Sequence, residues 1–281
     1  MFGSVREFCL SILENPALEA KLVSPQQADG SRLVDDQPGP PLYIETPART
    51  ADIRLQKGSD RLPKLRELVA PQARATCLER FAHHELCAVE LFAWALLAFP
   101  DTPAAFRRGL LQALQEEQLH LRLYLGRLSA LGHSFGSQPL SDYLWQHPAR
   151  IRVSPNPPAA FLCAMGLTFE QANLDYSLLY RDAFRDAGDE ESAQVLQRVH
   201  DDEVRHVKLA AHWLRILAPE HDGDVERYQT HTPFPLSPVR AKARRFDVAA
   251  RRRAGLSEEM IRYVQQARPT HQPQKSGPEK R

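Results

Sequence analysis

The sequence predicts an all-α protein organised around a four-helix bundle with one long crossover. Three observations support this prediction. Apolar residues recur at helical spacing through most of residues 71–219, prolines and glycines divide that stretch into four long segments, and a connection of 25 residues separates the second segment from the third. Two helix pairs, each closed by a short turn and joined to each other by one long crossover, account for all three observations.

The composition predicts a soluble protein and names no charged partner. The chain has 281 residues, 43% of them apolar, and a formal net charge of +1, which allows one large domain or two small ones. The N-terminus lacks a basic leader, and the most apolar stretch, residues 86–99, is too short and too close to charges to span a bilayer. Four cysteines without a CxxC pair favour a reducing, cytoplasmic location. They are Cys9, Cys77, Cys87 and Cys163.

Residues 1–66 are expected to form an N-terminal helix followed by an extended arm. Apolar residues recur at helical spacing through residues 1–24. Pro, Gly and Asp are then frequent in residues 25–64 and favour an extended chain over the surface, with a short strand at residues 42–44. The simplest role for this arm is to cover the core.

Capping and helix-breaking residues mark the ends of the four long helices, which we place in residues 67–219. Asp101-Thr102-Pro103 combines capping residues with a proline in the first turn, a typical helix start. Glycines and prolines supply the stops. The expected helices run from about Pro71 to Pro100, from after Pro103 to Gly132, from Pro157-Pro158 to Ala187-Gly188, and from about Asp189 to before Pro219.

Residues 220–267 are expected to form a C-terminal helical extension that packs on the bundle. A proline-punctuated loop begins this region, and a basic segment, residues 240–253, follows it. The remaining residues, 268–281, are polar and are predicted to be a disordered tail.

Two ExxH pairs lie on the inward faces of the second and fourth helices. Glu117 and His120 fall on the same apolar stripe as Tyr124, and Glu203 and His206 form the matching pair. Residues three positions apart share one face of a helix, so each pair can bind a single ion. Burying a carboxylate beside an imidazole costs several kcal/mol unless something compensates the charge.

The first and third helices each carry a single inward carboxylate, Glu85 and Glu170. Glu85 precedes Glu117 by 32 residues and Glu170 precedes Glu203 by 33, so the two halves of the chain repeat the same pattern. An internal duplication of a helix pair explains this register. Glu90 is the alternative to Glu85, but it lies five residues further on, about 140° away around the helix.

Four carboxylates and two imidazoles on four inward faces predict a dinuclear metal site. Its metal ligands would be Glu85, Glu117, His120, Glu170, Glu203 and His206, with Glu117 and Glu203 as bridging, catalytic carboxylates. A mixed oxygen and nitrogen set suits two iron ions, with manganese or a mixed pair as alternatives. The competing interpretation is a plain bundle whose glutamates are solvated or paired with arginine; Arg122 and Arg205 lie nearby in sequence.

Further side chains are candidates for roles around these ligands. Glu116 and Asp202 precede ligands and should face sideways, either solvated or in contact with a ligand. Metal-bound histidines usually donate their second N–H to a carboxylate or carbonyl. The candidates for such an orienting role are His84, Asp175 and Asp201. Tyr124 could act beside the metals, although core packing is the simpler interpretation, and the same holds for Tyr176 and Tyr180.

The helix motifs resemble those of a bacterial ferritin-like family known by a domain-of-unknown-function label, DUF455. The motifs are "FAHHELCAVEL", "EEQLH", "EQANLD" and "DDEVRHV", and "LRELVAP", "YLWQ" and "PFPLSPVRAKA" extend the match to roughly residues 60–262. The resemblance implies a dinuclear centre on the six ligands. Two positions depart from the pattern: Asn173, where a glycine is expected, and His84, where a small or aliphatic residue is usual. The diiron tRNA hydroxylases are similar at greater distance.

The predicted function is a diiron oxidoreductase that uses O₂ or peroxide to hydroxylate or oxidise a small-molecule substrate. No flavin, nicotinamide or rubredoxin-type motif is present, so an external electron donor is expected. A non-catalytic metal-binding or peroxide-detoxifying protein is one alternative. An RNA-modifying enzyme that binds phosphates through residues 240–253 is another. We expect a monomer or homodimer and no membrane partner.

Overall fold

The computed structural model describes residues 2–269 except residues 28, 32, 59 and 60. The predicted all-α class is confirmed, because helices make up the described elements apart from two strands of two residues each. The predicted disordered tail lies almost entirely outside the described residues, since residues 270–281 are not among them.

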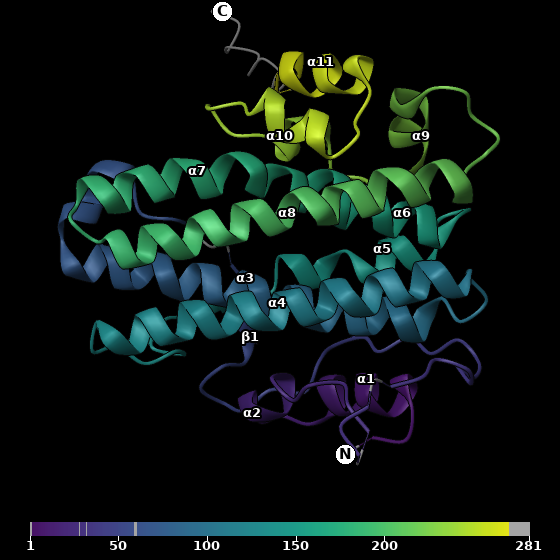
Figure 1. Cartoon of the computed structure of the whole chain (residues 1–281), viewed down its shortest axis with the longest axis horizontal. Coiled ribbons are helices and arrows are strands. Elements are labelled where there is room, and N and C mark those ends of the chain that lie inside the picture. The colour runs from purple at the N-terminus through teal and green to yellow at the C-terminus, as the bar shows by residue number, and fades with distance from the viewer. Residues whose placement is uncertain (1, 28, 32, 59–60, 270–281) are drawn as a thin grey trace, which may run out of the picture.

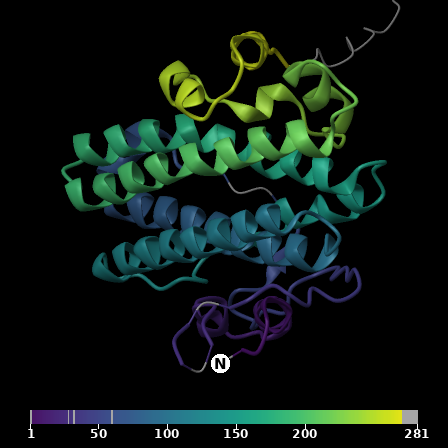
Figure 2. The same ribbon diagram turned by 45° about the vertical axis from the view of Figure 1, so that its right-hand side comes forward.

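Two antiparallel helix pairs lie against each other at the centre of the molecule (Figures 1 and 2). The first pair is α3 (Pro71–Ala98) and α4 (Ala104–Ala130). In the second pair, α7 (Gln171–Asp186) packs along α8 (Glu190–Leu217), and α8 also contacts α4. These helices begin and end within three residues of the predicted positions, and the third predicted helix begins before α7, at Pro157.

The third predicted helix is continuous but changes its winding in the middle. It consists of α6 (Pro157–Ala164), a π-helical stretch η3 (Met165–Glu170) and then α7. A side chain at Gly166 would come within 2.2 Å of the Cβ of Ala210, so only glycine allows this stretch to approach α8 so closely. Such π-helical stretches often occur at functional sites because they redirect side chains, and η3 ends at Glu170.

The N-terminal region contains two helices, α1 (Val5–Glu14) and α2 (Leu18–Lys21), so the prediction of one helix over residues 1–24 is wrong. The break comes at Asn15, which adopts an extended conformation because Pro16 disfavours helical geometry in the residue before it. The predicted strand at residues 42–44 is also wrong. Leu42 donates a single hydrogen bond to the Leu97 carbonyl, and the strand of the arm is β1 (Leu55–Gln56).

Two outer layers cover opposite sides of the central helices (Figure 1). The N-terminal helix α1 packs on α3. On the other side, next to α7 and α8, the chain forms α9 (Asp224–His231), η4 (Pro238–Ala241), α10 (Val248–Arg253) and α11 (Glu258–Gln266).

The long crossover and the segment before α3 pack against α3 and α7. The crossover contains β2 (Leu140–Ser141), η2 (Leu144–Gln146) and α5 (Pro148–Arg152), and the 3-10 helix η1 (Leu65–Val69) precedes α3. Strand β1 of the arm pairs in parallel with β2. The arm is thereby fixed to the crossover rather than lying loose over the surface.

The apolar core is divided into two clusters by a polar layer. One cluster contains the N-terminal part of α3 and the C-terminal part of α4, and the other contains the opposite parts of the same helices. Helix α3 is the one described helix long and apolar enough to cross a membrane, but 94% of its most apolar window is buried within the protein, as in a core helix. The predicted ligands lie in the polar layer between the two clusters.

Candidate metal centre

The structure brings all six predicted ligand side chains together in two overlapping groups. Glu85, Glu117, His120 and Glu203 form one group, and their ligand atoms lie within 4.8 Å of one another. Glu117, Glu170, Glu203 and His206 form the second group under the same limit. Glu117 and Glu203 belong to both groups, so their carboxylates lie where they can bridge two cations. Each group could hold a metal ion.

These side chains are enclosed by the two apolar clusters, and none of the six is more than 4% exposed. Each imidazole directs Nδ1 into the polar layer. His120 Nδ1 lies 3.4 Å from Glu117 Oε2, and His206 Nδ1 lies 2.9 Å from Glu117 Oε1 and 3.3 Å from Glu203 Oε2. The arrangement repeats the duplicated sequence pattern in space.

Five buried polar atoms of this layer have no hydrogen-bond partner among the residues that the structure describes. They are both carboxylate oxygens of Glu117, Oε2 of Glu203, and the Nδ1 atoms of His120 and His206. Leaving a buried polar atom unpartnered costs about 1–3 kcal/mol. All five atoms are donors of lone pairs and converge on the same small volume, so the residues present fit a pair of divalent cations.

The electrostatics indicate that the layer needs added positive charge. Burial, together with repulsion from Glu117, raises the pKa of Glu85 well above its ordinary value. Burial and the charges of Glu203 and Glu117 raise the pKa of Glu170 in the same way. Without metal, these two carboxyls retain protons, because four carboxylates cannot all be ionised at such close range in a core.

The two histidines gain rather than lose affinity for protons. Burial alone would lower the pKa of His120, but its contacts with Asp202, Glu117 and Glu85 raise it well above the ordinary value. The pKa of His206 is raised well above its usual range despite burial, by Glu117, Glu116 and Glu203. Metal ions at this position would replace these protons, since both kinds of charge compensate the same carboxylates.

Each imidazole also contacts a carboxylate through Nε2, the nitrogen that faces away from the polar layer. The carboxylate comes from the other helix in both cases: Asp202 on α8 contacts His120 on α4, and Glu116 on α4 contacts His206 on α8. His120 Nε2 lies 3.0 Å from Asp202 Oδ2, and His206 Nε2 lies 2.8 Å from Glu116 Oε2. Arg205 donates to both carboxylates, at 2.6 Å to Asp202 and 3.1 Å to Glu116. These contacts keep the proton on Nε2 and leave Nδ1 free to bind a metal.

The prediction that Asp175 and Asp201 orient these imidazoles is therefore wrong. Asp175 binds Arg251 in the C-terminal layer at 2.8 and 2.9 Å, and Asp201 lies 3.1 Å from Nδ1 of His200. A better signal for the orienting carboxylates was present in the sequence. An acidic residue, Glu116 or Asp202, directly precedes the glutamate of each ExxH pair. His84 lines the cavity described below.

Several other candidates have clear positions. Tyr124 is buried, and its ring stacks on Phe81 with centroids 5.5 Å apart, which supports core packing. Burial and the charge of Glu85 raise its pKa well above the ordinary value. Asn173, one of the two departures from the family pattern, donates from Nδ2 to Glu203 Oε1 at 3.1 Å. Sequence reasoning noted this position but did not predict the contact.

The arginines of the competing interpretation bind elsewhere. Arg122 donates to the carbonyls of Gln118 and Leu22. Arg205 pairs with Asp202 and Glu116 rather than with the inward glutamates. Neither arginine therefore provides the compensating charge for the polar layer.

Glu90, the alternative to Glu85, belongs to a different buried cluster. Arg49 binds its two carboxylate oxygens at 3.0 and 2.7 Å, Lys21 Nζ lies 3.5 Å away, and the Trp145 indole donates to it at 3.0 Å. These partners satisfy the carboxylate, which leaves Glu85 as the inward glutamate of α3.

A cavity of about 1260 Å³ adjoins the polar layer. Glu85 and Glu170 line it together with Asn173, so the cavity reaches the two glutamates that belong to only one group each. Aromatic side chains supply much of its wall: Phe81, Tyr143, Phe169, Tyr176, Tyr180 and Phe246. The cavity is large enough to hold a small molecule beside the polar layer.

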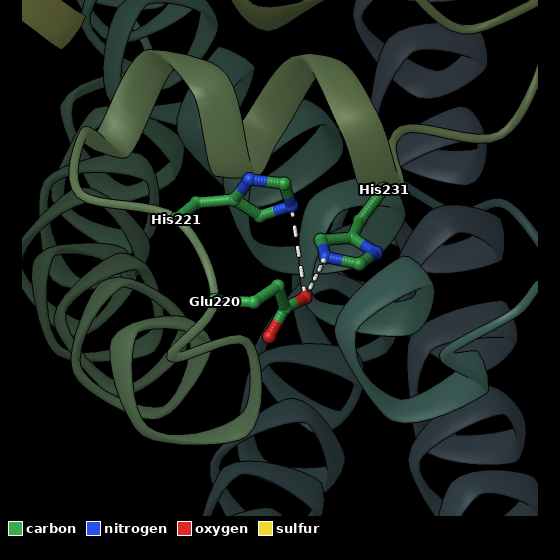
Figure 3. A group of neighbouring side chains, drawn as sticks. All are labelled: Glu220, His221 and His231. Atoms are coloured by element: carbon green, nitrogen blue, oxygen red, sulfur yellow. Dashed lines mark hydrogen bonds and ion pairs between the residues drawn. The ribbon is translucent and has the colours of Figure 1, made fainter.

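Figure 3 shows a third Glu/His group, unforeseen from the sequence, in which Glu220 is exposed and His231 is buried. Glu220 and His221 follow α8, and His231 ends α9. Glu220 Oε1 lies 3.2 Å from His231 Nε2 and 3.6 Å from His221 Nε2. The Glu220 side chain is 51% exposed, so water can solvate it. This group links the loop to the end of α9 by ordinary hydrogen bonding.

Comparison with known proteins identifies one family and nothing further. Neither the curated proteins nor the solved structures give a match. The model of the family described as protein of unknown function (DUF455) matches residues 14–262, which include the central helices, the polar layer and most of both outer layers. The chain belongs to this family.

Proposed function

We propose that the protein is a ferritin-like four-helix-bundle oxidoreductase with two iron ions. The first ion would be held by Glu85, His120 and the two shared glutamates, and the second by Glu170, His206 and the same pair. The observation that carries the proposal is the sharing of Glu117 and Glu203 by two buried groups whose remaining lone pairs have no partner. Manganese, or one ion of each metal, fits the same donors.

Iron bound there would supply the redox chemistry for using O₂ or peroxide. The chain's own contribution is position and exclusion of water. Asp202 and Glu116 fix the imidazoles, the helices hold the carboxylates rigidly, and the two apolar clusters keep water from the layer. Glu85 and Glu170 face the cavity, so a substrate there would meet the site from one side.

The surroundings of the site suit a small-molecule substrate and an external electron donor. All four cysteines are buried and free, which fits the proposed cytoplasmic location and provides no redox pair. Non-catalytic metal binding remains the alternative if the site proves inert.

Consumption of O₂ or hydrogen peroxide by the iron-loaded protein, with a chemical reductant, tests this function. We expect consumption by the wild-type protein and by a Glu220→Ala control, and none by a Glu117→Ala/Glu203→Ala variant. The variant must remain folded by circular dichroism. Iron bound by the wild type with no consumption of either oxidant would contradict the oxidoreductase and leave a metal-binding protein.

A further inference from the structure

We propose that the cavity beside the polar layer binds a small organic anion with an apolar body. The anionic group, a carboxylate or phosphate, lies at the arginine-lined mouth, and the apolar body points toward Glu85 and Glu170. The inference deepens the proposed function, on which its identification of a substrate class rests. The side chains that would select the anion, however, lie outside the metal-ligand set.

Most cations of the basic segment, residues 240–253, are either already paired within the protein or line the cavity. Arg245 pairs with Asp182, Arg251 with Asp175 and Arg252 with Glu258. Lys242 lines the cavity, but its ammonium donates to the carbonyls of two residues near the end of α11. Most of the positive charge that first suggested RNA is thus used within the protein.

Three arginines at the cavity have no acidic partner among the described residues: Arg61, Arg240 and Arg244. All three are exposed and line the cavity. The guanidinium of Arg240 stacks over the ring of Tyr143, 5.0 Å from its centroid, which holds it at the wall. Unpaired guanidinium groups at a concave site attract carboxylates and phosphates, with which they form two parallel hydrogen bonds.

The interior of the cavity has the opposite character. Its six aromatic rings and the side chains of Leu62, Leu144 and Met165 offer apolar contact and ring faces. The volume of about 1260 Å³ exceeds the usual range of roughly 300–1,000 Å³ for small-molecule sites, so a whole substrate fits within it. An ion without an apolar body would leave this wall unused.

The burial of the lining side chains sets the direction of the ligand. Glu85 and Glu170 are only 4% and 3% exposed, so they lie in the buried part of the cavity, beside the polar layer. Arg61, Arg240 and Arg244 are exposed, so they lie toward solvent, where they attract the anionic group. The ligand's apolar end therefore faces the polar layer, which is the end that an oxidant generated there would modify.

Matched probes test this assignment by calorimetry. The probes are naphthoate and dodecanoate as anions, naphthamide as the neutral analogue and naphthylmethylamine as the cation. We expect both anions to bind one per chain, the amide about tenfold more weakly, and the amine not at all. Failure of both anions to bind, or equal binding of the three naphthalene probes, would overturn the proposal.

Two arginine pairs from the same segment provide the variant and its control. Arg240→Gln/Arg244→Gln should weaken naphthoate binding about tenfold or more, whereas Arg252→Gln/Arg253→Gln, outside the cavity, should not change it. Ala172→Phe, which fills the cavity at a position beside Asn173, should reduce binding of all probes. An equal loss of naphthoate binding in the two double variants would contradict a role for the arginines at the cavity mouth.

The same experiments separate this inference from the proposed function. Metal content and unfolding midpoint are measured for every variant, and both should remain at the wild-type level in the arginine variants. A normal metal centre with no anion binding would remove the substrate class and leave the oxidoreductase proposal standing. Salt-sensitive binding of RNA, lost equally in both arginine pairs and unaffected by naphthoate, would replace the small anion with RNA.

Discussion

Two buried carboxylates on neighbouring helices, Glu90 on α3 and Glu117 on α4, have opposite surroundings. Both side chains are 0% exposed. Glu90 is neutralised by Arg49, whose guanidinium is always charged and binds both carboxylate oxygens, and the Lys21 ammonium lies 3.5 Å away. Within the described part of the chain, the close neighbours of Glu117 are Glu85, His120 and His206, with no lysine or arginine among them. Both of its oxygens lack a hydrogen bond there.

The difference shows how the chain separates a structural carboxylate from one that could bind metal. A guanidinium cannot leave, so the Glu90 cluster is permanently compensated. The neighbours of Glu117 are groups whose protons can exchange for a cation. Glu220 is a third case, because water solvates half of its surface and its contacts are those of an ordinary loop. The presence of Glu and His does not by itself distinguish the candidate metal centre. What distinguishes it is that its carboxylates are buried and that their charge is compensated by protons, which a metal cation can replace.

The largest expected effect is at the Glu90 cluster. Arg49→Met should lower the free energy of unfolding by about 3–5 kcal/mol, because it leaves Glu90 buried with much of its compensating charge removed. Urea denaturation, with and without added metal, measures this. The same loss should appear in both conditions, and a loss below about 1 kcal/mol would mean that Lys21 alone compensates the carboxylate.

The next effect concerns the pH dependence of the metal-free protein. The folded-state pKa values of Glu85, Glu170, His120 and His206 are raised, so the native state keeps protons that the unfolded chain releases. Their stabilisation is present at low pH and is lost as the pH rises. A net difference of one proton gives about 1.4 kcal/mol per pH unit.

The window from pH 6.5 to about 8 isolates this effect. Burial lowers the pKa of His147 to about 4, which acts in the opposite direction but only below its ordinary value of 6.5. Urea denaturation across the window should show falling stability without metal and a much flatter profile with metal. A flat profile in the metal-free protein would show that the polar layer holds no displaceable protons.

A smaller effect is expected where the imidazoles are held. Asp202→Asn and Glu116→Gln should each weaken metal binding about 10- to 100-fold, because the imidazole loses its charged partner on Nε2. Competition with a chelator of known affinity measures the change. Asp201→Asn is the matched control, since Asp201 contacts His200 instead. An equal loss of metal affinity in the control would mean that removal of any nearby negative charge weakens metal binding, and that orientation of the imidazoles is not the cause.

The smallest effect is expected at the exposed Glu220 group. Glu220→Gln should leave the metal content unchanged and the unfolding midpoint within error, because the side chain is half exposed and its hydrogen bonds can be replaced by water. Metal analysis and thermal denaturation check this. A clear loss of bound metal would show that the exposed Glu220 group itself binds metal. Burial would then not distinguish the candidate metal centre from other Glu/His groups.

The sequence predicted the features that depend on local pattern and spacing. Apolar periodicity and capping residues located the four long helices, and the duplicated Glu and ExxH spacing identified the six side chains that converge. Features that depend on tertiary contacts were not predictable in this way. Asp175 was a candidate for orienting an imidazole because metal-bound histidines usually donate to a carboxylate, but its actual partner, Arg251, is 76 residues further along the chain.

The same limitation applies to the surroundings of the site. Nothing local in the sequence indicates that Arg49, in the extended arm, neutralises Glu90 or that β1 pairs with β2 in the crossover. Glu116 contacts His206 and Asp202 contacts His120, so each contact joins α4 to α8. These contacts could be recognised only once the two helices were known to lie side by side. The break after α1 was an avoidable error, since Asn15-Pro16 is visible in the sequence.

The most direct test of the central claim is the metal content of protein purified from cells supplied with iron and manganese. Wild-type protein and the Glu220→Gln control should each contain about two metal ions per chain, and Glu117→Ala/Glu203→Ala far fewer. That result would establish the shared carboxylates as the basis of a dinuclear centre. Absence of metal from all three proteins, with each folded and equally stable, would contradict the account and leave the polar layer as a purely structural cluster.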